Sequence, residues 1–181
     1  MEKRSIIGDY DASAPIYDAR YSDEQMIKIG FVLGRAKPEA GSLILDAGCG
    51  TGMLFRSLGA ARRIVGVDAS LSMLREARKK ATEKVDLILA DIEALPIIDG
   101  CCDMVYSISV IQLIDDPKRG MEEIMRVLKE GGMAAISILR KSQRIGEVAE
   151  AYGGDLQFID SDSMKDAFIV GRKPVRGDGA D

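Results

Sequence analysis

The stretch LILDAGCGTG, from Leu43 to Gly52, constrains the fold more than any other part of the sequence. Its apolar run has the length of a β-strand and ends at Asp46, and three glycines then follow at a spacing of two: Gly48, Gly50 and Gly52. Glycine takes up positive φ without strain and has no Cβ to keep a ligand away from the backbone. We therefore predict a parallel strand, a tight turn and a helix from about Met53 whose first N–H groups are free, at the edge where α/β sheets bind ligands.

Two kinds of adenine nucleotide or nucleoside suit such a turn, and the residues around it favour one of them. A dinucleotide fingerprint, GxGxxG, requires a small third residue where this chain has Met53. The carboxylate of Asp46 would repel a pyrophosphate and attract an ammonium group. S-adenosylmethionine (SAM) has an adenosine end, an amino-acid end and no phosphate, so it fits both observations. A nicotinamide dinucleotide and a glycine turn without a ligand are the alternatives.

At these residues the sequence resembles the class I SAM-dependent methyltransferases, whose first motif is an acid followed by GxGxG. The resemblance extends over about residues 9–174 and is greatest to the ubiquinone and menaquinone biosynthesis type (methyltransferase type 11). It implies an α/β Rossmann-like fold with a seven-stranded, mostly parallel sheet in the order 3-2-1-4-5-7-6, an antiparallel last strand and helices on both faces. Residues 1–174 are then one domain, and the glycine- and charge-rich residues 175–181 form a flexible tail.

Carboxylates follow three successive predicted strands: Asp46, Asp68 and Asp91. Asp68 lies 20 residues after Gly48, the spacing at which a nucleotide-binding unit presents an acid to the ribose hydroxyls. Capping the helix from Ser70 to Ala81 is the alternative for Asp68, but Ser70 can provide that cap. The resemblance implies that Asp91 accepts a hydrogen bond from the adenine amine and that Ile92 packs on the ring.

The segment from residue 8 to residue 21, GDYDASAPIYDARY, holds three of the five tyrosines. We expect Pro15 to break or restart any helix here, and Ser22 or Asp23 to cap a second helix that runs to about Ala36. The segment could pack its aromatic rings on the sheet edge. The resemblance implies instead that residues 8–36 cover the cofactor, which brings three rings near the sulfonium, where tyrosine favours a cation: Tyr10, Tyr17 and Tyr21.

The end of the predicted fourth strand, Ser107 to Gln112, faces the place of the methyl acceptor in the resembling family. Many relatives have a histidine near Gln112, or an Asn/Asp-Pro-Pro-aromatic motif near Ser107, and this chain has neither. That argues against exocyclic-amine and glutamine acceptors and leaves the acceptor, small molecule or macromolecule, unidentified. A base for the acceptor proton could come from Asp9, Asp11, Asp18 or water.

Composition excludes several other kinds of chemistry. The chain has no histidine, and its three cysteines lack metal spacing, which disfavours metal sites and imidazole-based nucleophile pairs and predicts reduced thiols. A net charge of −4 gives no reason to expect a nucleic-acid partner. The sequence shows neither a membrane span nor the apolar core of a signal peptide, so we expect a cytoplasmic protein.

Later parts of the chain complete the predicted sheet. Strands are expected at 63–67, 85–89, 102–109, 134–139, 156–160 and 166–171. A helix capped by Asp116, with Pro117 at its first position and a buried methionine stripe, should end at Gly131. A further helix is expected at about Gln143 to Tyr152. Because no lid is inserted there, we predict a flat macromolecular acceptor or a partner subunit.

The sequence thus predicts a SAM-dependent methyltransferase that releases S-adenosylhomocysteine. Methyl transfer needs mainly the alignment of acceptor, methyl and sulfur and the exclusion of water, so it does not require histidine. A SAM-binding sensor without turnover is the alternative. No catalytic residue is assigned, and the predicted cofactor-binding residues are Asp46, Gly48, Cys49, Gly50, Gly52, Asp68, Ala69, Asp91, Ile92, Ser107 and Tyr17.

Overall fold

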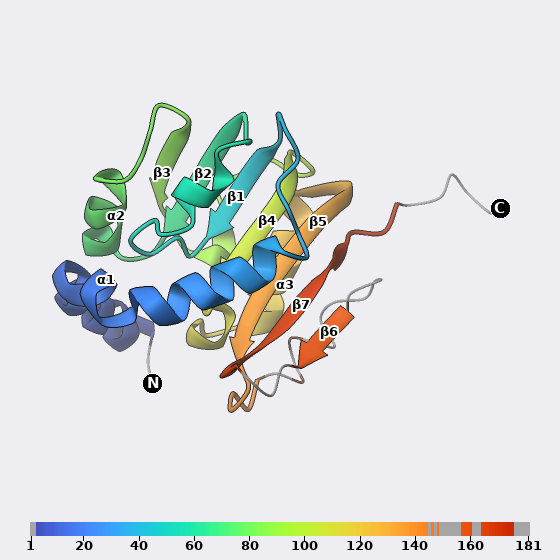
Figure 1. Cartoon of the computed structure of the whole chain (residues 1–181). Helices are drawn as coiled ribbons and strands as arrows, with labels where there is room; N and C mark the ends of the chain where they lie inside the picture. Colours follow the sequence, from blue (N-terminus) through green and yellow to red (C-terminus); the bar gives the residue numbers. More distant parts are fainter. Residues whose placement is uncertain (1–2, 145, 147, 149–156, 161–163, 176–181) are drawn as a thin grey trace.

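The chain folds as an α/β protein around one mixed sheet (Figure 1). The computed structural model describes residues 3–144, 146, 148, 157–160 and 164–175. The strands are β1 (Leu43–Ala47), β2 (Arg63–Asp68), β3 (Val85–Leu89), β4 (Cys102–Ile108), β5 (Leu128–Leu139), β6 (Gln157–Asp160) and β7 (Asp166–Arg172). They lie in the order β3-β2-β1-β4-β5-β7-β6. The pairs from β3 to β5 are parallel, and β7 is antiparallel to both β5 and β6. The predicted Rossmann-like α/β fold is confirmed.

Helices cover both faces of this sheet. The helix α1 (Lys3–Leu33) crosses one face, where α2 (Leu71–Arg78) also packs, and α3 (Pro117–Val127) lies on the other (Figure 1). Three short 3-10 turns follow strands at the edge that holds the cavities described below: η1 (Phe55–Leu58), η2 (Ile92–Ala94) and η3 (Ile111–Leu113).

Each face of the sheet has its own apolar core. Under α3 the core includes Met121, Ile124 and Val127, all with no exposed surface, so the predicted methionine stripe is confirmed as core. Under α1 and α2 it includes Val32 and the fully buried ring of Tyr106. Full burial of a valine, isoleucine or methionine side chain stabilises the fold by about 1.5–3 kcal/mol. Since β1 and β4 contribute to both cores, their carboxyl ends are fixed in place.

Local sequence signals set two helix starts as predicted. The Ser70 side chain accepts the Met73 N–H at 3.1 Å and caps α2. Asp116 caps α3 by accepting the Arg119 N–H at 3.0 Å, with Pro117 at the first helical position. In both cases the oxygen of a short polar side chain satisfies an N–H group that the helix leaves unpaired.

The predicted break at Pro15 is wrong, because α1 runs through this proline from Lys3 to Leu33. Proline removes one helical N–H donor and costs about 3 kcal/mol in a helix interior. Contacts to the rest of the fold offset this cost: Ala14 and Ile29 are buried, and acids of α1 bond to α2 and to the glycine loop.

Two other boundaries differ from the prediction. The helix expected from Met53 is only the 3-10 turn η1. The strand β5 begins at Leu128, because the chain pairs with β4 directly after α3 instead of continuing the helix to Gly131. The expected helix at Gln143 to Tyr152 falls largely outside the described residues, as does the expected tail after residue 175.

Candidate functional site

A cavity with about 750 Å³ of empty space, part of it open to solvent, lies where β1, β2, β3 and β4 end. Its lining comes from the loops after these strands and from α1. We call it the main cavity. It brings together seven of the predicted cofactor-binding residues: Tyr17, Gly48, Gly50, Asp68, Ala69, Asp91 and Ile92.

The glycine loop approaches the cavity closely because Gly48 has no side chain. Its φ is +80°, and a Cβ would lie 2.3 Å from Cγ2 of Val110. The Gly48 and Cys49 N–H groups donate to the carbonyl of Val67, at 2.7 and 2.9 Å. These two N–H groups are therefore used within the fold and are not available to a phosphate ligand.

Asp68 joins the loop to the second strand. Its Oδ2 accepts the Gly50 N–H at 2.8 Å and its Oδ1 accepts the Ser70 N–H at 2.9 Å. Burial raises its pKa, and these backbone hydrogen bonds partly oppose that rise. Because each carboxylate oxygen accepts about two hydrogen bonds, both retain capacity for a hydroxyl donor.

Asp91 and Ile92 form the far wall of the main cavity. Asp91 Oδ1 accepts the Glu93 N–H at 3.0 Å and so caps η2, an arrangement that fixes the orientation of its carboxylate. Ile92 is buried next to it. An acceptor beside an apolar side chain is suited to a planar ring that carries an amine.

Asp46 lines a smaller adjoining cavity, with about 390 Å³ of empty space, together with Cys49. Only 3% of Asp46 is exposed, and its Oδ2 has no partner among the described residues. Burial and the nearby Asp68 raise the pKa of Asp46 to about 7. A buried acceptor of this kind is poised to receive a cationic group.

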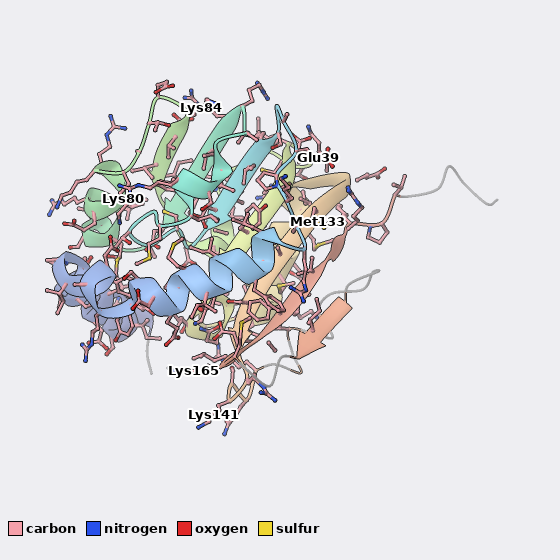
Figure 2. All side chains as sticks on the ribbon, viewed as in Figure 1. Glu39, Lys80, Lys84, Met133, Lys141 and Lys165 are labelled. Carbon is pink, nitrogen blue, oxygen red and sulfur yellow. The ribbon has the colours of Figure 1, made fainter. Side chains whose placement is uncertain are left out.

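Two acids fasten α1 over these cavities. Asp11 Oδ1 accepts from Ser70 Oγ at 2.6 Å and from the Ser72 N–H at 3.1 Å. Asp18 Oδ1 accepts from Thr51 Oγ1 at 2.5 Å, and its other oxygen forms an ion pair with Lys80, labelled beside α2 in Figure 2. Both acids were candidate bases, but the structure uses them to hold α1.

Three tyrosines of α1 stand over the site. The rings of Tyr10 and Tyr17 are 6.0 Å apart between centroids, and those of Tyr17 and Tyr21 are 4.9 Å apart. Burial raises the pKa of Tyr10 and of Tyr17, so both remain neutral phenols at physiological pH. A neutral ring keeps the electron-rich face that attracts a cation.

A third cavity, with about 780 Å³ of empty space, lies between the tyrosines and the end of β4. We call it the tyrosine cavity. It shares four lining residues with the main cavity: Tyr10, Tyr17, Ser109 and Leu113. Its other lining includes Asp9, Glu24, Gln25, Lys28 and Gln112. Two bound molecules could therefore meet across Tyr17 and Ser109.

The wall of the tyrosine cavity is held by a buried polar network that the sequence analysis missed. The Lys28 Nζ lies 3.0 Å from Asp166 Oδ1 and donates to Ser109 Oγ at 2.9 Å. Ser109 Oγ donates in turn to Asp166 Oδ2 at 2.9 Å. Among the described residues, Ser109 is the one non-glycine residue with positive φ, at 60°. No periodicity could reveal this network, because its members come from α1, β4 and β7.

Three predicted residues occupy other positions. Ser107 is fully buried, lines none of these cavities, and its Oγ has no partner within the described part of the chain. The alternation of β4 places Ser107 on the α3 face with Val105, and Ser109 lines the cavity instead. Cys49 lies only in the Asp46 cavity. Gly52 closes the loop, and a Cβ there would meet the Phe55 ring at 2.5 Å.

The described ranges contain no group of three or more histidine, cysteine or acidic residues that could hold a metal ion. None of the helices within them is both long and apolar enough to cross a membrane. All three cysteines are free thiols.

Comparisons with known proteins point to one family. The family model described as "Methyltransferase domain" matches residues 45–136, which include the glycine loop and all three strand-end acids. A malonyl-[acyl-carrier protein] O-methyltransferase of Hamiltonella defensa is 35% identical over 173 residues, covering 93% of this chain and 63% of the relative. The chain spans less than two thirds of the length of the first curated relatives it matches.

Solved structures show the same fold at low identity. In a complex from Haloferax volcanii between the Trm112 methyltransferase activator and a protein assigned as a methyltransferase, the TM-score is 0.77 at 22% identity, covering 92% of this chain and 98% of that one. A protein of Methanococcus maripaludis assigned as a SAM-dependent methyltransferase gives a TM-score of 0.77 at 18% identity, with 94% of each chain covered.

Proposed function

This chain belongs to the family of SAM-dependent methyltransferases, and from that premise we propose that it transfers a methyl group from SAM to an acceptor bound in the tyrosine cavity. The observation that carries the proposal is the position of Tyr17, which lines the main cavity, the Asp46 cavity and the tyrosine cavity. A reacting methyl group must lie where cofactor and acceptor meet, and Tyr17 marks that place.

The residues present fit SAM as a cofactor. In this proposal Asp68 accepts hydrogen bonds from the ribose hydroxyls, and Asp91 with Ile92 holds the adenine. The unpaired Asp46 Oδ2 receives the ammonium of the methionyl group. Ala69, Gly48 and Gly50 line the cofactor path, whereas Cys49 and Gly52 shape the loop and Ser107 supports β4 from the buried side.

The chain contributes alignment and exclusion of water. SAM supplies a methyl group on a positively charged sulfur, so the carbon is already activated. The rings of Tyr10 and Tyr17 provide negative faces near that charge and cover the junction of the cavities. Positioning of this kind can lower the barrier by roughly 7–11 kcal/mol.

Titration calorimetry with SAM, S-adenosylhomocysteine and NAD(P) tests the cofactor assignment. SAM and S-adenosylhomocysteine should bind and NAD(P) should not; the reverse order would refute the proposal. Incubation with methyl-labelled SAM and cell extract then tests turnover. Transfer of label to any fraction supports the enzyme, and tight binding without transfer favours the sensor that remains the alternative.

The named relatives suggest a first acceptor to test. They are malonyl-[acyl-carrier protein] O-methyltransferases, so a carrier-bound malonyl carboxylate is one candidate for this chain. Label should appear in the methyl ester of malonyl carrier protein if the candidate is right. Equal label with unloaded carrier protein would exclude it.

A second candidate is a methyltransferase subunit that needs a partner. The Haloferax volcanii neighbour is in a complex with the Trm112 activator, which suggests a partner protein as one way to complete the acceptor site of this chain. Co-purification with a Trm112-type protein, followed by the same labelling assay, tests this. Full turnover by the isolated monomer would contradict the need for a partner.

A further inference from the structure

Gln112 is a lining residue of the tyrosine cavity and carries a hydrogen-bond acceptor that the described part of the chain leaves unused. Its Nε2 donates to the carbonyl of Ser109 at 2.8 Å, which fixes the amide orientation and directs Oε1 elsewhere. That Oε1 is buried and has no partner among the residues that the structure describes, although Gln112 lines the cavity. A buried acceptor without a donor costs about 1–3 kcal/mol, so it marks a position for a ligand donor.

The carbonyl to which Gln112 is anchored is itself fixed. The Ser109 N–H donates to Ser137 Oγ at 2.8 Å, and the Ser109 hydroxyl is held between Lys28 and Asp166. A non-glycine residue at φ 60° costs of order 1–3 kcal/mol and persists only where its surroundings determine it. The network therefore holds the Gln112 amide in one orientation in the wall of the tyrosine cavity.

The cation in the same wall is already paired with two carboxylates. Lys28 is only 4% exposed, and its Nζ lies 3.0 Å from both Glu24 Oε1 and Asp166 Oδ1 and donates to Ser109 Oγ at 2.9 Å. Glu24 also pairs with Lys165, labelled in the lower part of Figure 2, so two cations balance two carboxylates. Because the charge of Lys28 is already balanced within the wall, the cavity disfavours an incoming carboxylate.

The remaining groups of the wall favour a positively charged or N–H-bearing ligand. Asp9 contributes a carboxylate, and three tyrosine rings contribute negative faces: Tyr10, Tyr17 and Tyr21. Aromatic faces with an acid are the usual surroundings of a bound amine or ammonium. We propose that the tyrosine cavity selects an aliphatic amine as the methyl acceptor, with Gln112 Oε1 accepting a hydrogen bond from its N–H. This inference rests on the function proposed above and names its substrate class.

The reaction favours an amine over an alcohol at this position. An aliphatic ammonium must first give one proton to Asp9 or water. The neutral amine then carries an N–H and a separate lone pair, so Gln112 can hold the N–H while the lone pair attacks the methyl carbon. The N–C bond forms as the S–C bond breaks, the bonding pair goes to sulfur, and the methylated ammonium loses a proton to Asp9 or water. The N–H becomes more acidic as charge develops, so its bond to Gln112 strengthens in the transition state. An alcohol must give up its only proton, and an amide oxygen is no base for it.

The first test measures ligand binding to the protein saturated with S-adenosylhomocysteine. Benzylamine, benzyl alcohol and benzoate have similar size and differ in the group offered to Gln112. NMR titration should show benzylamine binding at least tenfold more tightly than benzoate. Equal binding of benzoate, or no binding of any of the three, overturns the inference.

The second test uses variants of Gln112. Gln112→Leu should weaken benzylamine at least tenfold with unchanged S-adenosylhomocysteine affinity. Gln25→Leu changes a glutamine of the same cavity whose oxygen the inference does not use, and it should shift amine affinity less than threefold. An unchanged amine affinity in Gln112→Leu, or an equal loss in Gln25→Leu, refutes the role of this oxygen.

The two proposals fail in distinguishable ways. If SAM does not bind, the methyltransferase proposal fails. If SAM binds and malonyl carrier protein is methylated while benzylamine neither binds nor accepts label, the methyltransferase proposal stands and the amine inference fails. N-methylbenzylamine, identified by its mass and its label, supports both.

Discussion

The two halves of the site are built in different ways. On the cofactor side, the ends of β1, β2 and β3 present backbone groups and acids that lie within about 50 residues of one another, and their hydrogen bonds are local, such as Gly50 to Asp68. On the acceptor side, single side chains from distant segments meet: Lys28 and Ser109 are 81 residues apart, and Ser109 and Asp166 are 57 apart. A ligand site made from backbone leaves a sequence motif, and one made from a side-chain network does not.

The largest effect is expected from a substitution in the polar network on the acceptor side. Lys28→Met leaves the buried Asp166 without its cation, which should lower the free energy of unfolding by about 3–5 kcal/mol. Chemical denaturation measures this loss. In the control Lys129→Met, the lost pair with Asp103 is partly exposed, and the loss should stay below about 1 kcal/mol. Equal effects would show that the Lys28 network adds nothing specific.

Gly48→Ala should produce the next largest effect, on the cofactor side. The new Cβ would clash with Val110 at a φ of +80°, costing about 1–3 kcal/mol of stability and weakening SAM more than tenfold. Thermal unfolding and calorimetry measure the two quantities. Gly41→Ala is the matched control, since Gly41 has a φ of +81° and open space around its Cβ position. Gly41→Ala should be strained yet bind SAM with normal affinity. Weaker SAM binding in this control would mean that backbone strain alone explains the result for Gly48→Ala.

Asp68→Ala tests the cofactor side without introducing a steric clash. Removal of the carboxylate leaves the Gly50 and Ser70 N–H groups unpaired and takes away the proposed acceptor for the ribose, so SAM should bind about tenfold more weakly. Calorimetry at fixed pH measures the change. Asp86→Ala removes an exposed acid of the neighbouring strand and should have no effect on SAM. Unchanged affinity in Asp68→Ala would remove this residue from the site.

The smallest expected effect is a pH dependence from Asp46. Its pKa is raised to about 7 in the folded protein, so the ionised form is disfavoured there, and its contribution to stability falls as pH rises from about 4 through 7. SAM affinity should change in the opposite direction, because an ammonium pairs with the ionised form, and should be about tenfold lower at pH 6 than at pH 8. Asp46→Asn should flatten both profiles relative to the unaltered protein. A SAM affinity that is independent of pH would exclude the ion pair.

Much of the fold was predictable because its signals are local. The strands β1, β2, β3 and β4, the Ser70 cap and the Asp116-Pro117 start appear within two residues of their predicted positions. The failures have tertiary causes. The proline in α1 is tolerated because the helix is fastened at both ends, and β5 starts early because pairing with β4 outcompetes another turn of α3.

The Rossmann-like fold was implied by the resemblance of the sequence to a known family. The glycine loop and the acids at three strand ends were predictable from the residues alone, since strand length and glycine spacing act over a few neighbours. Long-range packing set the rest: Asp11 and Asp18 fasten α1, Ser109 rather than Ser107 lines the cavity, and Lys28 is paired with two carboxylates. Those outcomes depend on which distant side chains share one buried volume, and burial sets the energetic importance of each pairing.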